Sequence, residues 1–325
     1  MRAWQVQRAG EPAEVLQLVD LPVPEPGPGQ LRIRVTAAGI GLPDVLMCRH
    51  SYPLTPKSWF TPGQEATGVV TAVGPGAGVE LGSTVMSVTS FMEGHGSFAE
   101  ECLVAARSAF PVPDGLSPAQ AAGFWIPHMT GWIGLVDRGH LDCGDGLAVL
   151  GAAGGSGIAA VQLGRALGAR VIAVVSDEAR AEFCRRLGAD EAVILGQGDL
   201  AGRLREMTGG LGVDLIYDPV GGAAAEQAWT ALARHGRLLA VGFASGRWPR
   251  LETHNLVVTN TSLVGVFAGG YAREELDAIH ARLSALISEG RLRNAVTAEV
   301  PFDQLPAAVQ RLADRAVIGK LVMVP

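Results

Sequence analysis

The chain has 325 residues, which is more than one hydrophobic core usually carries, so we expect two domains. Its 26 basic and 32 acidic side chains leave a formal net charge of −6, and no run of lysine or arginine predicts binding to nucleic acid or to an anionic membrane surface. Glycine contributes 43 residues, well above its usual share, in a chain that is 48% hydrophobic. The glycine surplus therefore belongs to folded structure rather than to a disordered linker.

The cellular compartment is predicted from three features. The opening segment MRAWQVQRAGEP has no apolar stretch behind its arginines, so we do not expect it to act as a secretory signal. The longest apolar run, 147–164, contains five glycines and Gln162, so we predict a strand, a turn and a helix there rather than a membrane span. The four cysteines have no paired spacing, which favours reduced thiols and a cytoplasmic protein: Cys48, Cys102, Cys143 and Cys184.

The first third of the chain reads as short strands separated by turns. Residues 31–37, 65–73 and 83–89 alternate apolar and polar side chains, and proline and glycine punctuate the segments between them. Short strands at this spacing predict a β-rich domain of barrel type. Near Ser117 a serine before proline, followed by small helix formers, marks the start of a helix.

From Leu147 onward strands and helices alternate. The predicted strands are uniformly apolar, as in a parallel sheet covered on both faces: 147–152, 170–176, 191–195, 213–220 and 236–243. Three glycines stand where helices are expected to end, namely Gly168, Gly188 and Gly236. A further strand (262–268), a helix (273–289), a strand (295–302), another helix and the strand 320–325 complete the chain.

A glycine-rich turn follows the first of these apolar strands and opens a helix. Backbone N–H groups at a helix start bind phosphate when no side chain blocks the approach. The first position of the usual fingerprint is alanine here, and a purely structural turn is the alternative. The expected cofactor-binding residues of the turn are Ala152, Gly154, Gly155, Ser156 and Gly157.

The end of the next strand bears on the choice of cofactor. NAD enzymes place a carboxylate there, whereas this strand ends at Val175 and is followed by Ser176, with Arg180 one helical turn further. A hydroxyl and a cation suit a 2′-phosphate, so we predict NADPH over NADH. Asp177 complicates the prediction, because its carboxylate repels a phosphate if it points inward. The alternative is that Asp177 and Arg180 form only a solvated helix start.

Several segments in order resemble the medium-chain dehydrogenase/reductase superfamily, in its zinc-free quinone oxidoreductase (zeta-crystallin-like) branch. They are AAGIGLPDVLMCRHSYP, PGQEATGVVTAVGPG, GAAGGSGIAAVQLGRALGA, VDLIYDPVGG and GKLVMVP. The resemblance implies an α/β fold in which a Rossmann doubly wound parallel sheet, residues 122–262, is inserted into a GroES-like β-barrel catalytic domain, residues 1–121 and 263–325.

The same resemblance implies that no zinc is bound. Gly41 stands where the alcohol dehydrogenase relatives have a cysteine, and Gln64 where they have a histidine. The four-cysteine lobe that holds a structural zinc is replaced by the short SFMEGHGSFAEE. The remaining donors match no metal spacing, so packing and surface roles are expected for His95, His128, Cys48 and Glu65.

Without zinc to polarise a carbonyl, hydride transfer to quinones or α,β-unsaturated carbonyl compounds is the expected reaction. Tyr52 stands where related reductases carry a tyrosine, which implies a proton donor or a carbonyl-polarising group; a cleft-lining aromatic is the alternative. The branch usually has an asparagine near Gly41, which is absent here. An aromatic cleft suits a quinone or aryl enone, although core burial of the aromatics is the alternative; the expected cleft residues are Gly41, Asp44, Tyr52, Trp59 and Trp125.

Further cofactor positions carry over from the family: Thr130, Gly221, Gly242, Phe243 and Lys320. For each of these positions packing or turn formation is the alternative, most of all for Phe243 and Lys320. Leu195 replaces a tyrosine that helps to hold the phosphate in some relatives. A homodimer through an edge strand, 262–268, is also implied. Two alternatives to the leading function stay open: an enoyl thioester reductase and a non-catalytic NADPH-binding protein.

Overall fold

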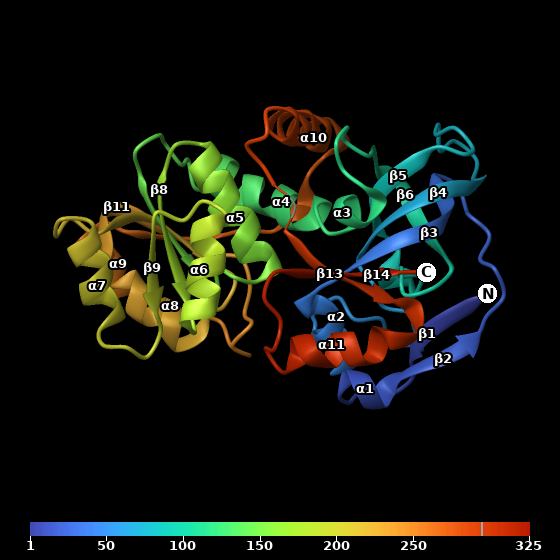
Figure 1. Cartoon of the computed structure of the whole chain (residues 1–325), viewed down its shortest axis with the longest axis horizontal. Coiled ribbons are helices and arrows are strands. Elements are labelled where there is room, and N and C mark those ends of the chain that lie inside the picture. The colour runs from blue at the N-terminus through green and yellow to red at the C-terminus, as the bar shows by residue number, and fades with distance from the viewer. Residues whose placement is uncertain (294) are drawn as a thin grey trace. The chain divides into compact units, whose positions relative to one another are not determined.

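The computed structural model describes residues 1–293 and 295–325, which form two units (Figure 1). Unit 1 contains residues 1–126 and 295–325, and unit 2 contains residues 127–293. The predicted insertion of one unit into the sequence of the other is confirmed. The second boundary lies near 293 rather than at 262, because β12 (Ser262–Gly265) pairs with the parallel sheet of unit 2, and because the Arg293 N–H donates to Gln162 in that unit.

Unit 1 is built on a closed antiparallel barrel. Its strands pair in the order β3-β4-β5-β6, and a β3–β6 pairing closes the ring. β14 (Lys320–Val324) adds to β3, and β13 (Val296–Pro301) pairs with β14 in parallel, so the end of the chain extends a sheet begun near its start. The barrel strands are β3 (Gln30–Ile40), β4 (Glu65–Val73), β5 (Thr84–Thr89) and β6 (Glu101–Pro111).

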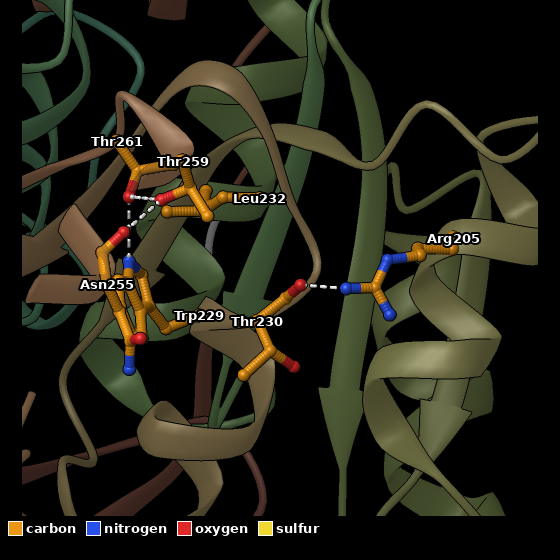
Figure 2. Close-up of a pocket in the computed structure, with 7 residues that line it drawn as sticks. All are labelled: Arg205, Trp229, Thr230, Leu232, Asn255, Thr259 and Thr261. Atoms are coloured by element: carbon orange, nitrogen blue, oxygen red, sulfur yellow. Dashed lines mark hydrogen bonds between the residues drawn. The ribbon is translucent and has the colours of Figure 1, made fainter. Parts of the chain in front are cut away.

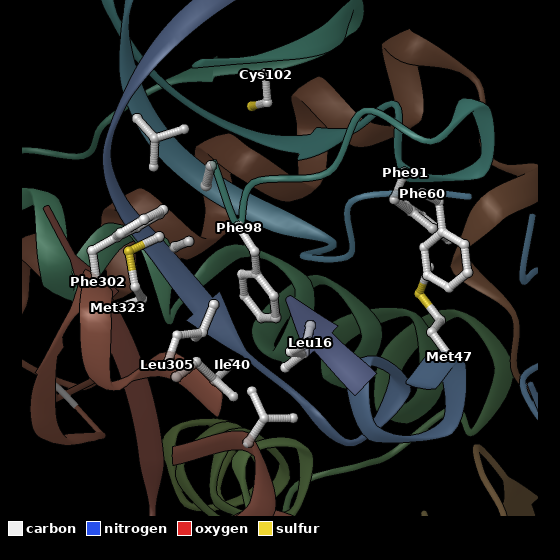
Figure 3. Packing of buried hydrophobic residues seen from close by; sticks show 14 of the residues in the cluster. Leu16, Ile40, Met47, Phe60, Phe91, Phe98, Cys102, Phe302, Leu305 and Met323 are labelled. Atoms are coloured by element: carbon white, nitrogen blue, oxygen red, sulfur yellow. The ribbon is translucent and has the colours of Figure 1, made fainter. Parts of the chain in front are cut away.

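The remaining elements of unit 1 surround the barrel and cover its core. They are β1 (Arg2–Val6), α1 (Pro12–Val15), β2 (Leu16–Asp20), α2 (Leu42–Cys48), α3 (Pro118–Ala122) and α11 (Leu305–Ala313). Figure 3 shows part of this core, in which Ile40 of β3 and Met323 of β14 belong to the same buried cluster as Leu305 at the start of α11. The predicted helix start at Ser117 is confirmed, because its hydroxyl accepts the Gln120 N–H and the Gln120 amide oxygen accepts the Ser117 N–H.

Unit 2 contains a parallel sheet in the order β12-β11-β10-β7-β8-β9. Its other strands are β7 (Gly146–Leu150), β8 (Arg170–Val175), β9 (Glu191–Ile194), β10 (Val213–Asp218) and β11 (Leu232–Ala240). The order reverses between β7 and β10, and ligands of such sheets bind at the carboxyl end of that reversal. The predicted doubly wound parallel sheet is thereby confirmed.

Helices cover both faces of this sheet. Leu147 and Val171 are cross-strand partners on the face of α5 (Gly155–Ala166), where Gly164 lets their side chains approach. Their neighbours Ala148 and Ile172 pack on the opposite face with α7 (Leu200–Met207) and α8 (Gly222–Trp229). The other helices are α4 (Trp125–Trp132), α6 (Glu178–Arg186), α9 (Thr253–Thr259) and α10 (Arg273–Ser288). Within the described part of the chain, no helix is long and apolar enough to cross a membrane.

Two of the three predicted helix-ending glycines have the left-handed conformation. Gly168 and Gly188 follow α5 and α6 with φ of +88° and +118°. The prediction for Gly236 was wrong: α8 ends at Trp229, and Gly236 lies inside β11, after the positive φ of His235. The parallel pairing of β10 with β11 shifts register in this region, so the strand begins earlier than its apolar run indicated.

Candidate functional site

The glycine-rich turn joins β7 to α5 at the carboxyl edge of the sheet. A Cβ on Gly157 would lie 2.3 Å from the Gly151 carbonyl oxygen, so the first turn of α5 packs directly on the backbone of the loop. A Cβ on Gly154, the N-cap, would meet only the Gly151 oxygen at 3.5 Å, and no side chain caps the helix. The N–H groups of this first turn are thus open to an anion.

Tyr217 connects this turn to the neighbouring strand. The Ser156 hydroxyl and the Tyr217 phenol are 2.9 Å apart, and Tyr217 is fully buried near the end of β10. Burial raises the pKa of Tyr217 to about 12, so the phenol stays protonated at neutral pH. Its hydrogen bond holds the Ser156 side chain in place. The apolar strand pattern gave no signal for this contact.

Asp218 ends β10 and holds the turn before α8. Its Oδ1 accepts the N–H groups of Val220 at 2.9 Å and of Gly221 at 2.7 Å. Gly221 has φ of +70°, and a Cβ there would lie 2.3 Å from the Arg247 carbonyl oxygen, so only glycine fits. Burial raises the pKa of Asp218 to about 6.

The end of β11 supplies the next predicted cofactor positions at the same edge. The Gly242 N–H donates to the Asp218 carbonyl oxygen at 3.2 Å, which brings these two strand ends together. The Phe243 ring packs on Trp248, with centroids 4.9 Å apart. Thr130 lies in α4 and is half-buried.

Ser176 and Arg180 both contact Asp177 after β8. The Asp177 carboxylate caps α6 by accepting the Arg180 N–H at 3.0 Å, and it also accepts the Ser176 hydroxyl at 2.9 Å and the Arg180 guanidinium. The Arg180 N–H is the main cause that lowers the pKa of Asp177, so this carboxylate is ionised at neutral pH. A 2′-phosphate would meet an arginine that already has an anionic neighbour.

Lys320 forms a buried ion pair in unit 1. Its Nζ lies 2.5 Å from Glu65 Oε1, and both side chains are less than one tenth exposed. The other Glu65 oxygen accepts the Ile126 N–H at 3.2 Å. The ammonium predicted to hold cofactor is therefore already neutralised by Glu65, and a cofactor contact of Lys320 stays a prediction.

Asp44 ties two backbone segments together beside this pair. Its Oδ2 accepts the Gly41 N–H at 2.8 Å, and its Oδ1 accepts the Gly63 N–H at 3.0 Å. Burial raises the pKa of Asp44 to about 7, although both N–H groups and Lys320 favour its charged form. A Cβ on Gly41 would lie 3.7 Å from Asp44 Oδ2 and 3.8 Å from Lys320 Nζ, so this glycine lies beside the charged cluster.

Tyr52 follows α2 and is half-buried against the unit 1 core. Burial raises its pKa, and a hydrogen bond to the Gln64 side chain acts in the opposite direction. The phenol is therefore protonated at neutral pH, as a proton donor must be.

The two tryptophans expected in the cleft differ in exposure. Trp59 is 65% exposed. Trp125 is 1% exposed and packs on Phe110 with ring centroids 4.4 Å apart, so it does not line a cleft as predicted. Trp125 is the first residue of α4, and its ring packs on the ring of Phe110 in β6, so that a large apolar surface is buried there.

Positions 41 and 64, where the alcohol dehydrogenase relatives have zinc ligands, carry no thiolate or imidazole in this chain. Gly41 has no side chain, and Gln64 directs its amide toward Met47, with Nε2 and Sδ 3.9 Å apart. Across residues 1–293 and 295–325 no group of three or more histidine, cysteine or acidic side chains is placed to hold a metal.

A hollow of about 280 Å³ lies in unit 2, away from the cofactor edge (Figure 2). It is lined by the ends of α7, α8 and α9 and by the beginning of β11, which places it at the amino edge of the sheet. The Trp229 indole N–H donates to the Thr261 hydroxyl at 3.3 Å, and Arg205 donates to the Thr230 carbonyl oxygen. These polar groups satisfy one another, and the hollow is not part of the candidate site.

Comparisons with known proteins agree with this architecture. Residues 27–114 match the alcohol dehydrogenase GroES-like domain family, and residues 155–285 match the family described as zinc-binding dehydrogenase. A Nematostella vectensis protein named quinone oxidoreductase-like protein 2 homolog is 30% identical over 295 residues, covering 89% of this chain and 80% of that protein.

Two solved structures are similar along the whole chain. A mycobacterial protein in complex with NADPH is 31% identical with a TM-score of 0.93, and both chains are covered completely. The Escherichia coli quinone oxidoreductase in complex with NADPH is 27% identical with a TM-score of 0.90, again with complete coverage of both chains. With the barrel, the parallel sheet and the glycine turn, these matches show that the chain belongs to the quinone oxidoreductase branch of the medium-chain dehydrogenase/reductase superfamily.

Proposed function

We propose that the protein is an NADPH-dependent reductase of quinones or α,β-unsaturated carbonyl compounds that works without zinc. The observation that carries the proposal is the donor set around Gly41. At positions 41 and 64, where the alcohol dehydrogenase relatives have a cysteine and a histidine, this chain has no thiolate or imidazole. A protonated phenol, Tyr52, is instead hydrogen-bonded to the Gln64 side chain. Such a site supports protonation of a reduced acceptor better than metal-assisted alcohol oxidation.

The residues of unit 2 fit a dinucleotide. The open N–H groups at Gly154 to Gly157 would hold the pyrophosphate. The glycines at 221 and 242 let the loops at the carboxyl edge pack closely, because a Cβ there would lie 2.3 Å from the Arg247 oxygen or 2.9 Å from the Pro219 oxygen. Arg180 and Ser176 would contact the 2′-phosphate. The nicotinamide, when bound, supplies the hydride that adds to the electron-poor carbon of the acceptor.

The residues of unit 1 would supply the proton that the reduced acceptor takes up. The Tyr52 phenol would donate a proton to the acceptor oxygen, or polarise it by a hydrogen bond. Asp44 holds the backbone at Gly41 and at Gly63, the residue before Gln64. The buried Glu65–Lys320 pair anchors the terminal strand β14 to β4 and holds its charges away from water.

A substrate panel tests the proposal. Oxidation of NADPH is followed by the loss of absorbance of the reduced nicotinamide at about 340 nm. The acceptors are a quinone, an aliphatic enone and an enoyl thioester, each at about tenfold excess over a typical KM. We expect turnover with the quinone or the enone. Turnover confined to the thioester would establish the enoyl thioester reductase instead, and tight NADPH binding without any turnover would identify a cofactor-binding protein.

A homodimer through β12 belongs to the same proposal. β12 is the edge strand of the unit 2 sheet, and its Leu263 and the nearby Phe267 are 43% and 66% exposed. An apolar edge of this kind supports pairing with a second copy. Sedimentation should give the mass of two chains, and a monomer at micromolar concentration would contradict the assembly. The free thiols support a reducing compartment, for which we propose the cytoplasm.

A further inference from the structure

The loop after β11, residues 241–250, is held firmly at the carboxyl edge of the parallel sheet. The Ala244 and Ser245 N–H groups donate to the carbonyl oxygens of Pro219 and Val220, at 3.1 and 2.8 Å. The Arg247 guanidinium forms two hydrogen bonds to the Glu226 carboxylate, at 2.6 and 3.2 Å. These contacts attach the loop to the turn between β10 and α8 and, through Glu226, to α8 itself.

Two aromatic rings stand on this loop in an otherwise polar and small stretch, FASGRWPR. Phe243 is half-buried, and Trp248 packs on it at 4.9 Å between centroids with an interplanar angle of 42°. Trp248 nevertheless remains 49% exposed. A large ring held in one place on an anchored loop, with half of its surface open, offers a ready stacking face at little entropic cost.

The position of this ring in the sheet indicates what it would stack on. In a doubly wound dinucleotide fold, each half of the sheet takes one nucleotide, and β10, β11 and β12 form the half that does not contain the glycine turn. The nicotinamide and its reaction partner therefore belong to this half. Gly221 and Gly242, the predicted cofactor contacts, border the loop that carries Trp248, since a Cβ on Gly221 would lie 2.3 Å from the Arg247 carbonyl oxygen.

We propose that Trp248, supported by Phe243, is a specificity-determining residue that stacks on the ring of the acceptor, so that planar aromatic quinones are preferred over aliphatic enones. This inference rests on the proposed reductase function and names the substrate class within it. Stacking of a planar ring on an indole contributes about 1 kcal/mol beyond the buried area, which corresponds to about a fivefold preference.

The test compares the variants Trp248→Ala and Trp248→Phe with the wild type, using naphthoquinone and methyl vinyl ketone as acceptors. We expect Trp248→Ala to lower kcat/KM for naphthoquinone about fivefold through a higher KM, and to leave kcat/KM for methyl vinyl ketone within about twofold. Trp248→Phe should recover most of the loss. Leu211→Ala is the control, because Leu211 is 81% exposed at the amino edge of the same sheet.

The outcomes separate this inference from the proposed function. Equal losses with both acceptors, a loss shared by Leu211→Ala, or no loss at all would overturn the role of Trp248 while the reductase activity of the wild type stands. A weaker Kd for NADPH or a changed sedimentation mass in Trp248→Ala, with the acceptor preference unchanged, would assign the ring to the cofactor or to a protein contact and also overturn it. Absence of wild-type turnover with both acceptors would overturn the proposed function and this inference with it.

Discussion

Asp177 places a negative charge beside the two side chains that we expect to hold the 2′-phosphate of NADPH. It caps α6 through the Arg180 N–H and also binds the Ser176 hydroxyl and the Arg180 guanidinium. A phosphate bound to Arg180 would meet this carboxylate at short range, where like charges repel even near a protein surface. The arginine is thus available only in competition with Asp177.

The substitution Asp177→Asn should tighten NADPH binding about fivefold and leave NADH binding nearly unchanged. Asparagine keeps the helix cap, so only the charge is removed. Nucleotide fluorescence titrations measure both dissociation constants. Asp199→Asn is the matched control, since Asp199 caps α7 in the same way. An unchanged ratio of the two constants would contradict the assignment of this strand end to the phosphate.

Tyr52 is the residue that we expect to donate the proton to the acceptor. If its phenol donates the proton, Tyr52→Phe should lower kcat about 100-fold with little change in KM, because the interaction is made mainly in the transition state. Stopped-flow or steady-state rates measure the change. Tyr271→Phe, in unit 2, serves as the control. Turnover unchanged in Tyr52→Phe would leave Tyr52 as a lining aromatic.

Among the elements, the end of β10 carries a buried carboxylate whose charge opposes folding. One oxygen of Asp218 accepts two backbone N–H groups, while burial raises the pKa from 3.8 to about 6. A group whose pKa rises on folding stabilises the fold fully at low pH and loses that contribution as the pH passes through the raised value. The contribution of Asp218 therefore lowers the free energy of unfolding as the pH rises from about 4 to about 6.

The substitution Asp218→Asn should remove this dependence. Asparagine retains an oxygen for both N–H groups and carries no charge, so its advantage over the wild type should grow from near zero at pH 4 to about 3 kcal/mol at pH 7. Urea unfolding at both pH values measures the difference. Asp142→Asn, an exposed aspartate of unit 2, is the control. A constant difference between wild type and Asp218→Asn across this range would contradict the buried charge.

Helices and strands were predicted correctly where the hydrophobic pattern and the adjacent turn or capping residues indicated the same element. The apolar strands of unit 2, the glycine turn and the cap at Ser117 could be predicted, because each depends on a few adjacent residues. Gly236 was misassigned because the residues before it in β11, LARH, are not a typical apolar strand pattern. Such a stretch resembles the end of the preceding helix, with Gly236 as its cap. The exposure of Trp248 could not be predicted, because this residue lies in a loop without a hydrophobic periodicity.

Contacts between distant segments were beyond local patterns. The Glu65–Lys320 pair, the Ser156–Tyr217 bond and the burial of Trp125 each depend on strands meeting in space. Zinc-ligand loss at Gly41 and Gln64 could be inferred only by resemblance to a family. Charge and aromatic character thus identified candidate residues, but not whether each faces a cleft or a core.

At the scale of the whole molecule, one domain is interrupted by the other in sequence. β14 pairs with β3, so residues after 319 complete a sheet whose first strand starts at residue 30. No apolar pattern pairs such distant strands, and the resemblance alone implied it. The same resemblance placed the second boundary at 262, whereas hydrogen bonds between β11 and β12 keep that strand in unit 2.

NADPH-dependent reduction of a conjugated acceptor without zinc can be tested with a single rate measurement. NADPH oxidation with naphthoquinone is followed for protein treated with a strong chelator and for untreated protein. We expect acceptor-dependent turnover that is equal, within about 20%, in both preparations. Loss of activity on chelation that added zinc restores, or no acceptor-dependent oxidation in either preparation, would contradict it.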